Sequence, residues 1–134
     1  MGIIEKIAPP KQYISADLKE QLNLQQQFYT IIHCTFKALE KEDAFIRIWP
    51  TTILLENVGN EKKLLQMDNM IAPPKWIRLF SGTTHHFTLY FEGLSKECTS
   101  FDFLEKINES GAFFVQGIQR NKTDIYRIDL SNTY

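Results

Sequence analysis

The sequence predicts an all-β protein, a single antiparallel β-sandwich of about seven strands and of immunoglobulin-like size. The first observation is a period of two in the second half of the chain. In the run 86–92, Phe87, Leu89 and Phe91 fall on one side and polar residues on the other, as in a strand that buries one face of its pleat. Similar runs separated by turn residues follow at 100–104, 112–116 and 124–130. Several such runs at regular spacing indicate a sandwich or a barrel.

The second observation is composition. The chain has 134 residues, of which 43% are hydrophobic, and it contains ten phenylalanines. This is enough for one domain with a core that needs no metal or disulfide. The residues expected in that core are Ile32, Phe36, Ile48, Phe87, Leu89, Phe91, Phe101 and Phe103.

Charge is balanced, with 15 Lys and Arg against 16 Asp and Glu and a net charge of −1. A near-neutral protein has no broad positive field that would hold nucleic acid or an anionic membrane. We therefore expect neither as a partner.

The first half is organised less regularly. Residues 1–27 form an N-terminal extension, in which Ser15 favours a short helix over 15–22, and the sandwich domain covers 28–134. A long strand is expected at 28–39, and a return strand runs from Phe45 to Glu56, with a bulge, kink or sheet edge at Pro50 because proline cannot donate to a ladder. The residues between 62 and 84 form the least regular part, with one short strand at 76–80.

Two cysteines are too few for a disulfide scaffold. Cys34 is in phase with the inward residues of its strand and is expected to be buried, whereas Cys98 lies in a polar stretch and is expected to be exposed. A bridge between them stays open. The N-terminus shows no apolar leader, and no run reaches transmembrane length, so we expect a cytoplasmic protein.

Residues for catalysis or metal binding are not grouped in the sequence. His85 and His86 are adjacent and would point to opposite faces, and no Cys-x-x-Cys or His-x-His spacing occurs. We expect no metal, no cofactor and no catalytic residue. One enzymatic alternative is a hydrolase that uses Glu92 and Asp102, which would require their two strands to pair.

The aromatic residues give the positive indication of a site. Trp49 is out of phase with the inward isoleucines and stands beside Arg47, and Trp76 precedes Arg78. Outward tryptophan next to arginine is typical of protein interfaces and of surfaces that stack on sugars. The alternative is that each tryptophan covers one end of the core.

These patterns favour a non-catalytic module that binds a protein partner, or a second copy of itself, through an exposed strand edge or the region around Trp76. The long strand at 28–39 would be a hazard as an exposed edge, which is why pairing with a partner is expected. The second hypothesis is a sandwich that binds a carbohydrate or another small ligand through Trp49, Trp76 and outward acids.

Four segments, 46–52, 87–94, 100–105 and 117–126, together resemble a family of small uncharacterised bacterial proteins. The resemblance covers about residues 28–130 and leaves the N-terminal extension out. It implies a β-sandwich and supplies no catalytic residues.

Overall fold

The computed structural model describes residues 29–107 and 111–131. Within these ranges the chain is all-β, which confirms the predicted class. The strands are β1 (Tyr29–Lys37), β2 (Ala44–Ile46), β3 (Ile53–Glu56), β4 (Glu61–Asp68), β5 (Ile77–Leu79), β6 (Thr84–Glu92), β7 (Ser100–Leu104), β8 (Phe114–Gln119) and β9 (Ile125–Asp129). The helix expected at 15–22 lies outside the described residues.

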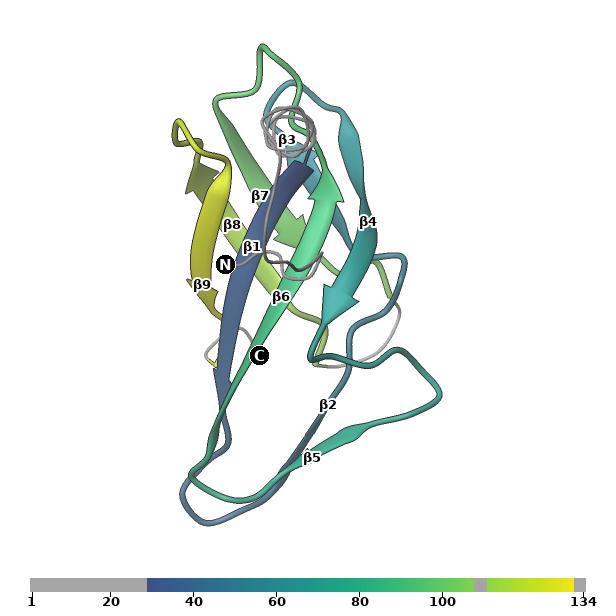
Figure 1. Ribbon diagram of the computed structural model, residues 1–134, viewed down its shortest axis with the longest axis vertical. Coiled ribbons are helices and arrows are strands. Elements are labelled where there is room, and N and C mark those ends of the chain that lie inside the picture. Colours follow the sequence, from purple (N-terminus) through teal and green to yellow (C-terminus); the bar gives the residue numbers. More distant parts are fainter. Residues whose placement is uncertain (1–28, 108–110, 132–134) are drawn as a thin grey trace, which may run out of the picture.

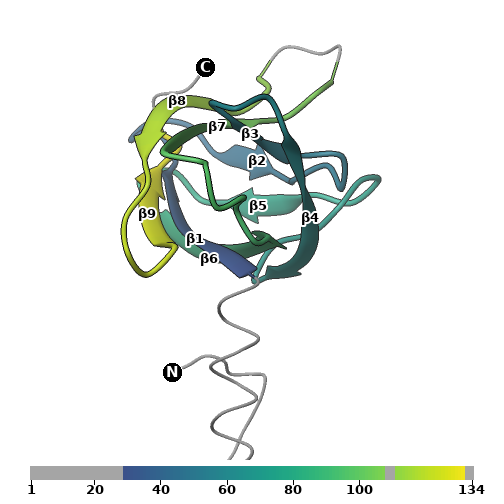
Figure 2. The same cartoon turned by 90° about the horizontal axis from the view of Figure 1, so that it is seen from above.

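Seven strands form one sheet in the order β8-β7-β3-β4-β6-β1-β9, and β2 and β5 form a second, two-stranded sheet (Figure 1). The large sheet bends round so that its end strands β8 and β9 lie side by side (Figure 2). Register shifts in the β4–β6 and β7–β8 pairs contribute to this curvature, since a bulge bends and twists a strand. The strands thus form a curled sheet and a small second sheet in place of two comparable layers.

Strand β1 lies in the interior of the large sheet. It pairs with β6 on one side and with β9 on the other, so it is an interior strand and presents no free edge. Its pairing with β9 is parallel, so the sheet is not purely antiparallel. An alternating pattern determines which face of a strand is buried, but it does not determine which strand lies beside it.

The core fills the inside of the curled sheet. All eight residues expected there are buried: Ile32, Phe36, Ile48, Phe87, Leu89, Phe91, Phe101 and Phe103. The rings of Phe91 and Phe103 meet edge to face with centroids 6.0 Å apart, a favourable geometry for aromatic pairs. The period of two therefore identified the buried face correctly.

Residues 62–84 were predicted to be the least regular part of the chain, but their first residues belong to the regular strand β4. It lies between β3 and β6, and its register shifts between Leu64 and Gln66. Leu64 and Met67 both pack against the core although they are three residues apart, while Leu65 is exposed. The extra residue of the bulge breaks the period of two, which is why the sequence pattern missed this strand.

Pro50 separates two strands that were expected to form one return strand with a bulge, a kink or a sheet edge at this proline. β2 belongs to the small sheet and β3 to the large one. Between them the chain turns, and the backbone N–H and the side-chain hydroxyl of Thr52 both donate to the carbonyl of Trp49, at 3.0 and 2.6 Å. The turn therefore changes sheets and places Trp49 at its start.

Both cysteines are free and buried, so the expectation for Cys34 is confirmed and that for Cys98 is wrong. The loop that carries Cys98 is held onto the sheet because Arg120 Nη1 donates to the carbonyls of Ser95 and Cys98, at 2.6 and 3.1 Å. Tertiary hydrogen bonds of this kind leave no mark in the local polar sequence. Over the ranges that the structure describes, no helix is long and apolar enough to cross a membrane.

Candidate functional site

The two-stranded sheet carries the residues that the sequence singled out. Its strands pair antiparallel with Ala44 opposite Leu79 and Phe45 opposite Arg78. Alternation along the strands buries Ile46 of β2 and Leu79 of β5 in the core. It turns Phe45 and Arg78 outward. The small sheet therefore has one face on the core and one face that remains open.

Arg47 lies between the two tryptophans on the open face. Its guanidinium carbon is 3.7 Å from the ring centroid of Trp76 and 5.3 Å from that of Trp49. Both distances are within the range of cation–π contacts. Three of the four candidate binding residues are thus brought together, although they come from segments almost 30 positions apart.

Arg78, the fourth candidate, occupies the other half of the same face. Its Nη2 and Nε donate to Asp43 Oδ2 at 2.6 and 3.1 Å, and its guanidinium carbon is 4.9 Å from the ring centroid of Phe80. The backbone N–H of Ser81 donates to the other carboxylate oxygen of Asp43 at 2.9 Å. The hydrogen bond from Arg78, followed by that from Ser81, lowers the pKa of Asp43, so this carboxylate is charged at neutral pH.

Two further aromatic residues, Phe45 and Phe80, belong to the site and were not predicted. They are 56% and 63% exposed, and Trp76 is 50% exposed. Large apolar side chains gathered at such exposure mark an interaction surface more often than single exposed ones do. We call the set Phe45, Arg47, Trp49, Trp76, Arg78 and Phe80 the aromatic–arginine face.

A signal for these two residues was present in the sequence. The segment 45–49 reads Phe-Ile-Arg-Ile-Trp, and the segment 76–80 reads Trp-Ile-Arg-Leu-Phe, nearly its reverse. In the observed register Phe45 faces Arg78, and continuing that register places Arg47 opposite Trp76. Each arginine therefore meets an aromatic ring across the strands, which avoids a pair of facing like charges.

A buried carboxylate fixes the edge of the aromatic–arginine face. Glu105 is only 4% exposed, and its Oε2 accepts from the backbone N–H of Trp49 at 3.1 Å. Its Oε1 accepts from the backbone N–H of Phe113 at 2.9 Å. Because charged acceptors make strong hydrogen bonds, Glu105 ties the backbone under Trp49 to the large sheet.

The hydrolase alternative required β6 and β7 to pair, and they do not. Strands β3 and β4 lie between them in the sheet. Glu92 Oε1 accepts from the backbone N–H of Lys63, and Asp102 Oδ1 accepts from that of Gly117, each at 2.8 Å. The two carboxylates are thus held apart, each by a different backbone group.

Metal-ligating residues are also not grouped. In the part of the chain that the structure describes, no three His, Cys, Asp or Glu side chains come close enough to hold a metal ion. His85 Nε2 is 2.7 Å from the carbonyl of Asn69, and its neighbour His86 lies on the other face of the strand.

Comparison with known proteins gives no relative. No protein-family model, curated protein or solved structure matches the chain.

Proposed function

We propose that this chain is a non-catalytic interaction module that binds a protein partner through the aromatic–arginine face. The observation that carries the proposal is the stack of Arg47 on Trp76 and Trp49, beside half-exposed Phe45 and Phe80. Tryptophan, other aromatics and arginine are enriched among residues that dominate binding energy at protein interfaces. Among the described residues, the six side chains of this face include no nucleophile and no pair of carboxylates for acid–base chemistry.

The face is a better binding surface than a strand edge of the large sheet. β1 is paired on both sides. The end strand β8 is interrupted by a register shift opposite 101–103 and by Gly117, whose φ is +70°, and the other end strand, β9, has only five residues. Irregularities of this kind protect an edge against pairing with another strand. Of the two routes expected from the sequence, the region around Trp76 is therefore the one we propose.

The charges of the face favour a different protein over a second copy. A two-fold contact brings the same patch of both copies together. Arg47 and Arg78 of each copy would then be brought towards the same two arginines of the other copy. A partner with an apolar side chain and a carboxylate or carbonyl group complements the face better, because the carboxylate can bind the arginines while the apolar group packs on Phe45, Trp76 or Phe80.

Affinity capture from lysate of the source cells tests the proposal, with the wild-type chain, Trp76→Ala and Leu65→Ala as baits. Leu65 is the matched control because it is 52% exposed and lies on β4, outside the aromatic–arginine face. We expect a captured protein that binds wild type and Leu65→Ala alike and is lost with Trp76→Ala. The purified pair should then show at least a tenfold higher Kd with Trp76→Ala, the loss expected for a residue that dominates an interface. Equal capture by all three baits would contradict the proposal.

Carbohydrate binding is the second candidate, and the half-exposed ring of Trp76 favours it. An open tryptophan face stacks on sugar rings, but Arg47 at 3.7 Å already occupies one face of this ring. Titration with oligosaccharides of several classes, followed by tryptophan fluorescence, separates the two candidates. A saturable change in fluorescence would favour the glycan, and a flat response would favour the protein partner.

Three finer features belong to the same proposal. The small sheet, whose Ile46 and Leu79 join the core, would act as the second layer of a sandwich of immunoglobulin-like size. The segments 46–52, 87–94, 100–105 and 117–126 support membership in a family of small bacterial proteins with that architecture. Two free, buried cysteines fit a reducing compartment such as the cytoplasm.

A further inference from the structure

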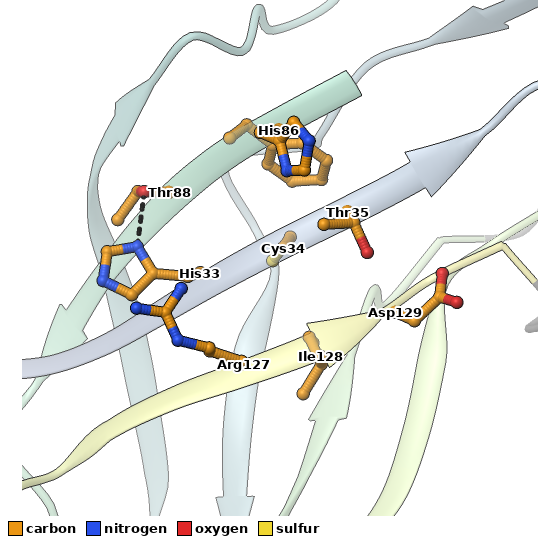
Figure 3. A pocket seen from close by; sticks show the side chains of 9 residues that line it. His33, Cys34, Thr35, His86, Thr88, Arg127, Ile128 and Asp129 are labelled. Atoms are coloured by element: carbon orange, nitrogen blue, oxygen red, sulfur yellow. Dashed lines mark hydrogen bonds between the residues drawn. The ribbon is translucent and has the colours of Figure 1, made fainter. Parts of the chain in front are cut away.

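A shallow hollow of about 440 Å³ lies on the outer face of the large sheet, over β6, β1 and β9 (Figure 3). It is separate from the aromatic–arginine face, which belongs to the small sheet. Strand register arranges its outward side chains in two rows across the three strands. The rows are Thr88, His33 and Arg127, and His86, Thr35 and Asp129.

The first row ends in an arginine that is available to a ligand. Arg127 is exposed, and among residues 29–107 and 111–131 no hydrogen bond or ion pair engages its guanidinium. Figure 3 shows this group beside the imidazole of His33. An arginine in this position supplies several N–H donors in a planar fork that suits carboxylate and phosphate groups.

His33 adds a neutral donor to the same row. Its Nδ1 is 2.8 Å from the hydroxyl oxygen of Thr88. Partial burial, and then the charge of Arg127, lowers the pKa of His33 below its ordinary value of 6.5, so the ring is neutral at pH 7. When the Thr88 hydroxyl donates to Nδ1, Nε2 carries the ring proton and can donate to a ligand.

The second row ends in a carboxylate. Asp129 Oδ1 accepts from the backbone N–H of Ser131 at 2.9 Å. Hydrogen bonds from Ser131 and Thr35 lower the pKa of Asp129, so this group is charged at neutral pH. Arg127 and Asp129 are two positions apart on β9, and their backbones are therefore about 6–7 Å apart along the strand. The hollow thus has a positive end and a negative end.

We propose that this hollow binds a small molecule that carries an oxyanion at one end and a hydrogen-bond donor at the other. The oxyanion, a phosphate or a carboxylate, lies against Arg127 and His33. A hydroxyl or amino group of the same molecule donates to Asp129. The volume of the hollow suits a ligand of the size of a hydroxy acid, an amino acid or a sugar phosphate.

The test uses the full-length chain and follows the imidazole proton resonances of His33 by NMR during titration with inorganic phosphate or with acetate. We expect a saturable shift with at least one of the two anions, together with a rise in the pKa of His33, because the bound anion offsets the charge of Arg127. Arg127→Gln should weaken binding about tenfold or more, the loss expected for a charge-assisted contact. Lys41→Gln removes one exposed positive charge outside the hollow and should leave binding unchanged.

Asp129→Asn should have the opposite effect on anion binding from Arg127→Gln. Removal of the negative charge should tighten binding of the bare anion by severalfold, since inorganic phosphate and acetate have no donor group for Asp129 to bind. Saturation with phosphate alone would assign a phosphate-bearing ligand, and saturation with acetate as well would extend the assignment to carboxylates. The proposal would be overturned by unshifted His33 resonances at about 20 mM of either anion, or by equal binding to wild type and Arg127→Gln.

Discussion

The two sheets of this protein both carry phenylalanines, but those of the large sheet are buried and those of the small sheet are exposed. In the large sheet, phenylalanines such as Phe91 and Phe103 are 0% exposed and contact one another inside the curl. On the open face of the small sheet, Phe45 and Phe80 are more than half exposed, and the rings of Trp76 and Phe80 contact arginine guanidinium groups. The difference shows that aromatic content alone does not separate core residues from surface residues. The two groups differ in what the rings contact, which is other aromatic rings in the core and arginine guanidinium groups on the surface.

The small sheet also has a different source of order. Its inward residues Ile46 and Leu79 anchor it to the core, while its outward residues Phe45 and Arg78 are exposed. An exposed face that is kept aromatic gains no stability from that exposure, because the apolar area stays in water. This contrast predicts that mutations in the two regions have very different effects on folding.

The largest expected effect comes from Phe91→Ala, compared with Phe45→Ala. Phe91 is fully buried, and its loss should lower the free energy of unfolding by about 3–5 kcal/mol because it removes a buried ring and leaves a cavity. Phe45 is 56% exposed, and its loss should change that free energy by less than about 1 kcal/mol. Urea denaturation followed by circular dichroism measures both. A similar loss of stability in the two variants would remove the distinction between the sheets.

The sequence predicted the buried side of the large sheet because alternation directly reports a face. Strand β7 was predicted with the observed bounds, 100–104, and every residue assigned to the core is buried. Strand β4 could not be found in this way, since its bulge places Leu64 and Met67 on the same face with an odd spacing. The neighbours of β1 were also beyond reach, because strand order depends on long-range contacts.

The candidate site was predicted in part for the same reasons. Arg47, Trp49, Trp76 and Arg78 were singled out by residue type and phase, and all four lie on the open face or at its edge. Their convergence depends on the pairing of β2 with β5, which no local pattern specifies. The outer hollow was not predicted at all, because His33, Thr88 and Arg127 come from three strands whose register becomes known only in the folded chain.

An intermediate effect is expected from Glu105→Gln, which tests the link between the sheets. The substitution keeps the size of the side chain but replaces one acceptor oxygen with an N–H₂ group, which would face the N–H of Trp49 or of Phe113. Loss of one such buried hydrogen bond should lower the free energy of unfolding by about 1–3 kcal/mol. Glu97→Gln, at an exposed position, should have no measurable effect in the same urea experiment. Unchanged stability of Glu105→Gln would show that Trp49 is held by other contacts.

A smaller effect on folding is expected from Arg47→Lys, which tests whether the arginine orders the rings of the open face. Lysine keeps the positive charge but lacks the planar guanidinium that lies against Trp76 and Trp49. The free energy of unfolding should fall by about 1 kcal/mol, because Arg47 is half-buried and cation–π contacts range from about 0.5 kcal/mol when exposed to about 2 kcal/mol when desolvated. The near-ultraviolet circular dichroism of the tryptophans should change nevertheless, because the rings lose the group that orders them. Arg78→Lys, whose guanidinium contacts Phe80 and no tryptophan, should leave that signal unchanged. If Arg47→Lys also left it unchanged, the aromatic–arginine face would be ordered by packing rather than by the arginine, and its residues would behave as a continuation of the core.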